Sequence, residues 1–530
     1  MEICNKKILL VCKETYSYPL YYLAQKWMKS NKVAAFFFNP VETMYNSCLL
    51  NDTTYYAFKK IQNITIYNSD GPAKAFTDIL DSESYDEEWL KHIEERYSHF
   101  ANVNNQIMST QFLTRHYHFR NYMYKCTYAQ QLNWLILNYK NIINIFDEYK
   151  PDVVFDTDSA ELARCIIREI CYFRNIPYVT VGYARYEFYL MYTFNLNQST
   201  DLSFVESYHK HFASAESNLE DEIKYVSDFR IQSSIMNDMY KNDVTSQYRP
   251  DSYWKVFKKI VGEFYYFWNQ DITAKNLSLK RSNKVLYNDS LQFLQFFLHY
   301  EFLKQRLMKS NPFFKKPVEG ENYVYMPLHL IPESSTFSVA PMYVNELTII
   351  EAVSKSLPAG WWLYVKEHQA MLGERATSFY KLVNRLPNVK MVQLNYYQDP
   401  KPWIMKSKGV VTISGTTAYE AALLQRHAIV FSDVPFKLIE GIMRCRSFED
   451  LPQLLKNFTT PLDNIKSCAA YIAAVKKMGV SVNIKLLLNE ALGDIRNHIE
   501  PSKEYRDNLN RLEELLLKGY QYYIDHSCQK

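Results

Sequence analysis

Glycine is scarce in this chain, with only 12 among 530 residues, about a third of the usual share of about 7%. No two glycines stand two or five positions apart. The glycine fingerprint of dinucleotide-binding domains, the Walker A phosphate loop and the kinase glycine loop are therefore all absent. A phosphate ligand would have to be bound by helix N-termini and side chains instead.

Long apolar runs, closely spaced cysteines and an excess of one charge are also lacking. No run approaches the roughly 18–20 apolar residues that span a bilayer, and the N-terminus has no hydrophobic region of signal-peptide length. The nine cysteines lie apart without a CxxC motif, which is typical of reduced thiols in a cytoplasmic protein. With 61 basic and 57 acidic residues, the charge gives no indication of a nucleic-acid partner.

The hydrophobic pattern indicates an α/β protein of more than one domain. Short apolar runs alternate with helical patterns of crossover length, which favours parallel sheets. Strands are expected at 6–12, 33–38, 152–156 and 177–181, and again at 323–327, 361–366, 389–393, 409–413 and 428–431. Ligands of such sheets bind beyond the carboxyl ends of the strands, so two Rossmann-like sheets that face each other would form one cleft.

The expected division of the chain has four parts. They are a first Rossmann-like unit at 1–245 with a helical insertion at about 84–149, a helical connector and linker at 246–319, a second Rossmann-like unit at 320–455, and a helical tail at 456–530. Two prolines and a glycine between 311 and 322 place the linker.

Two polar clusters of the second half directly follow expected strands. MPLHLIPESST contains His329 and Glu333 in an otherwise apolar, proline-bounded loop. In YVKEHQA, Lys366 and His368 would share a face if the strand continued. A cation and an imidazole there could neutralise a departing phosphate without a metal. A helix cap and a charged strand end are the simpler alternatives.

The third cluster lies where the strand VVTI meets a helical pattern, at Ser414, Gly415, Thr416 and Thr417. Glycine is expected here because the backbone must turn and come close to a ligand. The hydroxyls can cap the helix, whose free N–H groups form an anion site. Glu420, one turn further on, can accept hydrogen bonds from sugar hydroxyls. An ordinary N-cap followed by a surface glutamate is the alternative.

The order of these clusters is P-L-H-x-x-P-E-S-S, then V-K-E-H, then I-S-G-T-x-x-x-E-A. This order resembles the capsule polysaccharide synthesis family of glycosyltransferases, which is similar to bacterial Kdo transferases. The likeness covers about 320–445. It implies a GT-B fold, a nucleotide-sugar donor held mainly by the second half as co-substrate, and no obligatory metal or cofactor.

The resemblance also implies roles for single residues. Lys366 and His368 match the motif that faces the donor phosphate, the Ser414–Thr416 turn matches the phosphate turn, Glu420 matches the glutamate near the ribose, and Glu333 matches the polar residue of the first loop.

The sequence departs from the family pattern at two places. Gln369 stands where the family has a proline, which leaves the geometry of the preceding histidine open. Gln425-Arg426-His427 replaces a glycine-lysine-proline turn, and we expect this change to alter only the turn.

The first half must supply the acceptor site. Asp156 and Asp158, in VVFDTDSAE, follow an expected strand. A carboxylate there can act as a general base, or as a nucleophile if the reaction retains configuration. An N-cap for the next helix is the alternative. Arg185, in VGYARYEFY, follows another strand and is expected to contact an acceptor sugar or a lipid phosphate.

One helical stripe and two histidine pairs have competing interpretations. WKVFKKIVGEFYYFWN places five residues along one stripe beside three lysines: Trp254, Phe257, Val261, Phe264 and Trp268. Aromatic residues at helical spacing predict a core helix; a helix on the membrane surface, suited to a lipid-linked acceptor, is the alternative. The His-x-His pairs at 116–118 and 209–211 lack an acidic or cysteine partner at ligand spacing, so no metal site is expected.

Together these features predict a metal-independent glycosyltransferase that moves a sugar from a nucleotide donor to a surface polysaccharide or a lipid-linked glycan. A CMP-linked, Kdo-like ulosonic acid is the donor that the resemblance suggests first. A cytoplasmic location, with peripheral contact to the inner membrane, is expected. Two alternatives stay open: a non-hydrolysing UDP-sugar epimerase, and a non-catalytic component of capsule assembly or export.

Overall fold

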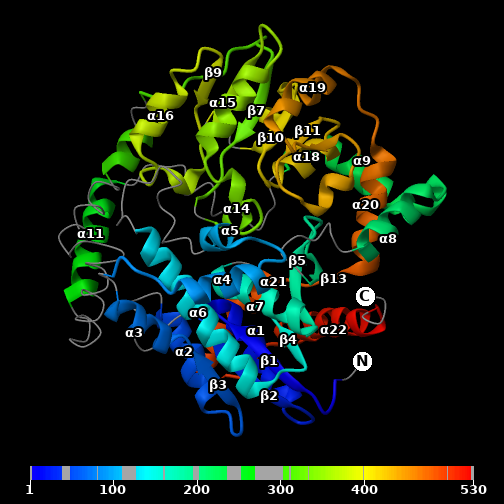
Figure 1. Ribbon diagram of the computed structural model, residues 1–530. Helices are drawn as coiled ribbons and strands as arrows, with labels where there is room; N and C mark the ends of the chain where they lie inside the picture. Colours follow the sequence, from blue (N-terminus) through cyan, green and yellow to red (C-terminus); the bar gives the residue numbers. More distant parts are fainter. Residues whose placement is uncertain are drawn as a thin grey trace.

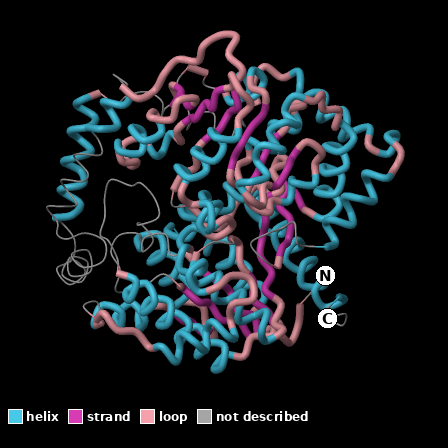
Figure 2. Tube along the Cα trace, turned by 45° about the horizontal axis from the view of Figure 1, so that its top comes forward, coloured by secondary structure: helices cyan, strands magenta, loops and turns pink. Residues whose placement is uncertain are grey.

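The computed structural model describes residues 3–526 except 39–47, 80–81, 110–126, 159–160, 195–201, 236–251, 269–301, 309–311, 332, 395, 398 and 498. The described chain forms two α/β units, each built around its own sheet (Figure 1). Helices flank the strands of both units (Figure 2). The predicted fold class, two Rossmann-like units with largely parallel sheets, is confirmed.

The first sheet has seven strands in the order β13-β6-β5-β4-β1-β2-β3. They are β1 (Lys7–Cys12), β2 (Lys32–Phe37), β3 (Thr65–Asn68), β4 (Val153–Phe155), β5 (Tyr178–Tyr183), β6 (Tyr189–Thr193) and β13 (Val480–Ser481). The strands β1 to β5 pair in parallel, whereas β6 and β13 are antiparallel additions at one edge. The sequence analysis missed both added strands.

Helices cover both faces of this sheet, which explains why β1, β2 and β4 are apolar and buried except for the lysines that begin β1 and β2. They are α1 (Ser17–Trp27), α2 (Cys48–Lys59), α3 (Asp70–Asp78), α4 (Glu87–Arg96), α5 (Val103–Met108), α6 (Tyr128–Tyr149) and α7 (Leu162–Arg174). In β1, Ile8 and Leu10 belong to the core that contains α1, while Leu9 and Val11 belong to the core that contains α6 and α7.

The second sheet has six strands, all parallel, in the order β12-β11-β10-β7-β8-β9. They are β7 (Tyr323–Pro327), β8 (Trp362–Lys366), β9 (Val389–Val392), β10 (Gly409–Thr412), β11 (Ala428–Val430) and β12 (Ile442–Arg444). Its helices are α14 (Ser334–Phe337), α15 (Glu346–Ser356), α16 (Thr377–Val383), α17 (Pro400–Lys406), α18 (Thr417–Leu423) and α19 (Leu451–Lys456). The sequence analysis missed β12 and α17.

The C-terminal helices connect the two units. The helix α20 (Ile465–Met478) belongs to the core of the second unit, as do α8 (Leu202–Ala213) and α9 (Glu220–Ile231). The chain then returns through β13, and α21 (Ile484–Asn497) and α22 (Lys503–His526) pack on the first sheet (Figure 1). The apolar side chains of α8 and α9, which the expected division placed in the first unit, pack with α20 in a core that also contains Tyr186 and Met191 of the first unit.

The aromatic stripe of 254–269 lies on α11 (Tyr253–Trp268), and its predicted burial is wrong for the three residues that can be judged. Trp254, Phe257 and Val261 are 64%, 53% and 48% exposed. The stacked rings of Trp254 and Phe257 have their centroids 5.6 Å apart. These side chains therefore form an apolar surface that the described part of the chain leaves open.

Two further observations concern membranes and metals. Among the described residues, no helix is long and apolar enough to cross a bilayer, and no three His, Cys, Asp or Glu side chains gather as metal ligands would. The pair at 116–118 lies outside the described residues, and that at 209–211 is part of α8.

Candidate functional site

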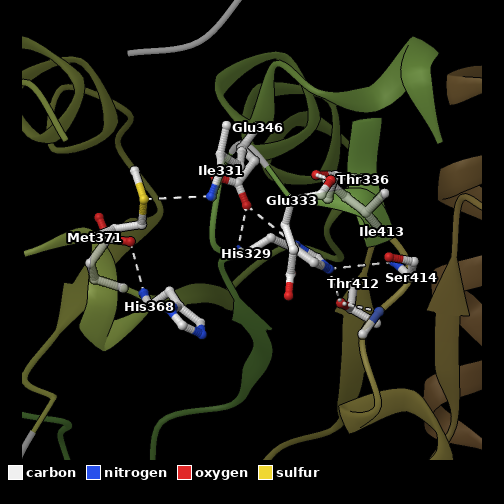
Figure 3. Close-up of polar contacts among 12 residues, drawn as sticks. His329, Ile331, Glu333, Thr336, Glu346, His368, Met371, Thr412, Ile413 and Ser414 are labelled. Carbon is white, nitrogen blue, oxygen red and sulfur yellow. Dashed lines mark hydrogen bonds and ion pairs between the residues drawn. The ribbon is translucent and has the colours of Figure 1, made fainter. Parts of the chain in front are cut away.

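His329 joins two strand ends at the carboxyl edge of the second sheet (Figure 3). It follows β7 and is buried. Its backbone N–H donates to Glu346 at 2.7 Å, and its Nδ1 lies 3.3 Å from the same carboxylate. On the other side, the N–H of Ser414 donates to Nε2 at 3.4 Å, and Thr412 Oγ1 lies 3.3 Å from Nε2. These contacts favour the tautomer with its proton on Nδ1, since Nε2 must accept from Ser414.

Gly415 is needed for a different reason from the one that the sequence analysis proposed. A Cβ atom at this position would stand 2.5 Å from Thr412 Oγ1 and 3.5 Å from His329 Nε2. The Gly415 N–H donates to the same threonine hydroxyl at 3.2 Å. The close approach is therefore made by the protein itself, and the glycine lets the turn after β10 pack against His329.

The expected capping of α18 is also wrong. Thr416, at the N-cap position, has a helical backbone and makes no side-chain cap. Within the described residues, neither the Thr416 hydroxyl nor that of Thr417 has a hydrogen-bond partner, and both side chains are partly exposed. The two hydroxyls are thus open to a ligand at this edge.

A buried network of charges lies behind His329. Arg375 donates to Glu367 through Nε at 2.7 Å and to Glu346 through Nη2 at 2.8 Å. The hydroxyl of Tyr380 donates to Glu367 at 2.9 Å. Burial alone would raise the pKa of Glu346, but Arg375 and His329 hold the pKa below its usual range. Burial raises the pKa of Glu367, against the opposing effect of Arg375. The network fixes the loops that follow β7 and β8.

Lys366 and Glu420 are two ionisable groups at this edge whose pKa values burial moves toward neutrality. Burial lowers the pKa of Lys366 to about 8, although Asp399 and Glu420 oppose this change. Burial and then Asp399 raise the pKa of Glu420 to about 7, while Arg185 and Lys366 act in the opposite direction. The Lys366 Nζ lies 5.9 Å from the ring centroid of Trp403. Both groups therefore titrate close to neutrality.

Arg185 reaches this pair from the first unit. It follows β5, is exposed, and has a left-handed backbone with φ of 64°. Beside it, the Tyr471 hydroxyl of α20 donates to the Ala184 carbonyl at 2.9 Å. The structure thus brings Arg185, expected at the acceptor, close enough to Glu420, expected at the donor ribose, for its charge to lower the pKa of that carboxyl.

His368 and Glu333 lie in the loops that follow β8 and β7. The strand β8 ends at Lys366, so His368 does not continue it but caps a short 3₁₀ helix, with Nδ1 accepting from the Ala370 N–H at 3.3 Å. Burial lowers the pKa of His368, and Glu333 counteracts this effect. Figure 3 shows the side chains of His368 and Glu333 beside His329. The predicted shared strand face of Lys366 and His368 is therefore absent.

In the first unit, Asp156 does not have the position of a general base. It is fully buried and holds Arg164 with both oxygens, at 2.7 and 3.0 Å. The Tyr178 hydroxyl also donates to it at 2.9 Å. Burial raises the pKa of Asp156, with Arg164 opposing. Asp158 is only partly buried and receives one bond from Arg164 Nη1 at 3.2 Å, so it retains acceptor capacity.

The carboxyl ends of the two sheets meet at the boundary between the units. The N–H of Glu161, after β4, donates to Ser338 Oγ, after β7, at 3.4 Å. Glu161 has a φ of 86° and is paired with Lys13, which follows β1. Ligand groups from both units can therefore converge on one space, which the sequence pattern had predicted from the strand directions alone.

Several residues that shape the site were missed from the sequence. They are Glu346, Glu367, Arg375, Asp399 and Trp403. A signal existed for Asp399, because an aspartate before Pro-Lys-Pro is a typical helix start. No comparable signal marks Arg375, whose two carboxylate partners lie 8 and 29 positions away.

Comparisons with known proteins give no close relative. No family model and no curated protein matches the chain. The solved structures that match include the KpsC β-Kdo 2,7 transferase of Thermosulfurimonas dismutans, with 8% identity over 68% of this chain and 90% of that one and a TM-score of 0.30. A glycosyltransferase of Rickettsia africae matches with 11% identity over 94% and 100% of the chains and a TM-score of 0.27. The UDP-GlcNAc 2-epimerase of Neisseria meningitidis bound to UDP-GlcNAc matches with 11% identity over 88% and 98% and a TM-score of 0.25. Such low scores carry no argument about the activity of this chain.

Proposed function

We propose that this chain is a metal-independent glycosyltransferase that binds a nucleotide-sugar donor at the carboxyl edge of its second sheet. The observation that carries the proposal is the group of Lys366, Glu420 and Arg185 at the boundary of the units. A desolvated cation and a carboxylate with a pKa near 7 are typical of ligand sites rather than of structural ion pairs. The order of motifs around them, which resembles a family of glycosyltransferases, supports the same assignment.

The donor is held by three kinds of group in this proposal. Lys366 faces the donor phosphate and supplies positive charge in a site with little water. The hydroxyls of Thr416 and Thr417 donate to phosphate oxygens, and Ser414 keeps the turn in place through its bond to His329. Glu420 accepts hydrogen bonds from the ribose hydroxyls, which favours its ionised form.

Sugar transfer breaks the bond between the anomeric carbon and the donor phosphate oxygen, and the electron pair leaves with the phosphate. Lys366 stabilises that negative charge. The N–H of the neutral His368 ring can donate to the same leaving group, and Glu333 favours a protonated ring as charge develops. A carboxylate of the first unit takes the proton of the acceptor hydroxyl. We assign this role to Asp158, since Asp156 is engaged by Arg164.

A CMP-linked ulosonic acid is the first donor to test, because the family that the motifs resemble is similar to Kdo transferases. The acceptor in this proposal is a surface polysaccharide or a lipid-linked glycan, and Arg185 contacts its acidic or phosphate group. A lipid-linked acceptor would fit with α11 lying on the inner membrane through Trp254, Phe257 and Val261, which are exposed.

The test is nucleotide binding followed by product analysis. Thermal shift with CMP, UDP, GDP and TDP is measured without added metal and then with magnesium. We expect CMP to stabilise the protein without metal, and Glu420→Ala to abolish the effect. Glu351→Ala, a half-exposed glutamate on α15, is the matched control and should leave it unchanged.

The other outcomes separate the alternatives. Preference for UDP, with conversion of a UDP-sugar in the absence of any acceptor, would replace the transferase with an epimerase. Absence of a response to all four nucleotides would contradict the donor site and favour a non-catalytic role in capsule assembly or export.

A further inference from the structure

A surface pocket of about 840 Å³ lies at the opposite edge of the second sheet from the candidate site. We call it the basal pocket. It is lined by residues that immediately precede β7, β10 and β11, among them Asn322, Lys408 and His427, by the end of α17, and by Phe458 and Thr460. The four residues of β10 separate the two sites by roughly 13 Å at about 3.3 Å per residue. A ligand in the basal pocket therefore does not contact Lys366 or Glu420.

The basal pocket combines cations with aromatic rings. The Lys406 Nζ donates to the Tyr397 hydroxyl at 2.8 Å and lies 5.0 Å from the centroid of that ring. Lys408 is exposed, with its Nζ 5.9 Å from the ring of Trp361. The ring of Tyr396 is 45% exposed beside them. Exposed rings with donors at their edges are suited to flat sugar faces, and the lysines to an acidic group.

The turn Gln425-Arg426-His427 contributes unused hydrogen-bonding groups. Among the described residues, neither Arg426 Nε nor His427 Nδ1 has a hydrogen-bond partner, although both atoms are buried. The remaining nitrogens are engaged: Arg426 Nη2 donates to the Met405 carbonyl at 2.9 Å, and His427 Nε2 lies 3.1 Å from the Thr460 carbonyl oxygen. Buried polar atoms without partners are rare, and a small shift of this turn would be needed for a ligand in the basal pocket to reach them.

Gln425 contributes an exposed polar side chain in the same turn. Its φ of 56° is left-handed because it ends α18, where the Gln425 N–H donates to the Ala422 carbonyl at 3.1 Å and the Arg426 N–H to the Ala421 carbonyl at 2.8 Å. The Gln425 side chain lines the basal pocket, and its Nε2 donates to the Leu462 carbonyl at 3.5 Å. The helix end therefore holds this side chain at the rim of the basal pocket.

The acidic side chains of the basal pocket restrict the kind of anion that can bind there. Glu319 and Glu321 also line it, and Glu321 is paired with Lys390. Their negative charge lowers the net positive charge of the basal pocket, so a ligand with few negative charges suits it better than a polyphosphate. The volume lies within the range of about 300–1,000 Å³ for small-molecule sites, which suits a short oligosaccharide. We propose that the basal pocket binds an acidic saccharide through Lys406, Lys408 and the Gln425-Arg426-His427 turn.

This assignment goes beyond the proposed function and depends only on the lining of the basal pocket. The test is isothermal titration of the full chain with oligosaccharides of N-acetylneuraminate, glucuronate and galacturonate, and with neutral maltotetraose. We expect at least one acidic oligosaccharide to bind and maltotetraose not to bind. The double variant Lys406→Ala/Lys408→Ala should weaken this binding at least tenfold, and Gln425→Gly should weaken it while the melting temperature is maintained.

Two controls locate the ligand. Lys355→Ala, an exposed lysine on α15, should leave binding unchanged. Glu420→Ala should also leave it unchanged, even though we expect that variant to lose nucleotide binding, so the two proposals fail separately. The assignment is overturned if none of the acidic oligosaccharides binds, if maltotetraose binds equally well, or if binding survives the double lysine variant.

Discussion

Replacing Glu420 with glutamine should make the ligand-free protein more stable at neutral and alkaline pH. Burial and Asp399 raise the pKa of this carboxyl from 4.5 to about 7. In the unfolded chain the group ionises near 4.5, so above that pH the folded state must either keep the proton or accept an unfavourable charge. This difference in pKa between the folded and the unfolded state lowers the free energy of unfolding by about 1.4 kcal/mol per pH unit, which amounts to roughly 3 kcal/mol above pH 7. Since Glu420 is partly exposed, solvent screening makes this an upper value.

The sign follows from the direction of the pKa change. Relative to Glu420→Gln, the free energy of unfolding of the natural protein should be unchanged below about pH 4.5, fall as the pH rises to about 7, and stay low above it. Thermal unfolding followed by circular dichroism between pH 4.5 and 8.5 measures this. For a unit of 150–250 residues, 3 kcal/mol corresponds to at most roughly 6–12 °C in melting temperature.

A matched variant and a ligand sharpen the experiment. Glu351→Gln removes a half-exposed carboxylate on α15 and should show no such trend. A nucleotide whose ribose hydroxyls donate to Glu420 should stabilise the natural protein more than Glu420→Gln at pH 8. If Glu420→Gln is less stable than the natural protein at pH 8, or if the difference does not change with pH, then Glu420 is not held in an unfavourable site and the reasoning fails.

Three further predictions concern the residues around the site. Gly415→Ala should destabilise the protein by about 1–3 kcal/mol, because the new methyl group would overlap Thr412 Oγ1; the added change Thr412→Ala should restore part of the melting temperature, and no recovery would contradict the contact. Arg375→Leu should cost about 3–5 kcal/mol, since it leaves two buried glutamates without their cation; soluble protein with an unchanged urea midpoint would refute this. Asp156→Asn should lower the urea midpoint, because it weakens a buried ion pair. Asp158→Asn should leave the urea midpoint unchanged and abolish sugar transfer. The reverse pattern would identify Asp156 as the general base.

The position of the site could be predicted because it depends on strand direction. The apolar runs before His329, Lys366 and Ser414 were long enough to identify β7, β8 and β10 within about one residue. In a parallel sheet, polar residues that follow such runs must share one edge. The same rule predicts the positions of Glu420 and Arg185, because each comes shortly after a strand whose carboxyl end faces the boundary of the units.

The charge network could not be predicted, because no local pattern links its members. Glu367 stands between Lys366 and His368 and looks like part of an exposed strand end, yet it is buried against Arg375. Nothing in the spacing pairs that arginine with Glu346 as well. The stripe of α11 failed for a related reason: periodicity shows which residues share a face, but not whether another element covers that face.

The charged groups described above are of two kinds, and the difference between them assigns their roles. In the first kind, an arginine donates directly to buried carboxylates: Arg164 to Asp156, and Arg375 to Glu346 and Glu367. Such pairs are destabilising to break and leave no atom for a substrate, so they hold loops in place. Lys366 and Glu420 lie among the charges of Asp399 and Arg185 as well as each other's, and burial moves both pKa values to between about 7 and 8. Only groups of this second kind can exchange protons or accept a ligand charge near neutral pH at little cost. The chemistry of the site is therefore expected to depend on Lys366 and Glu420, while the arginine networks behind them set its geometry.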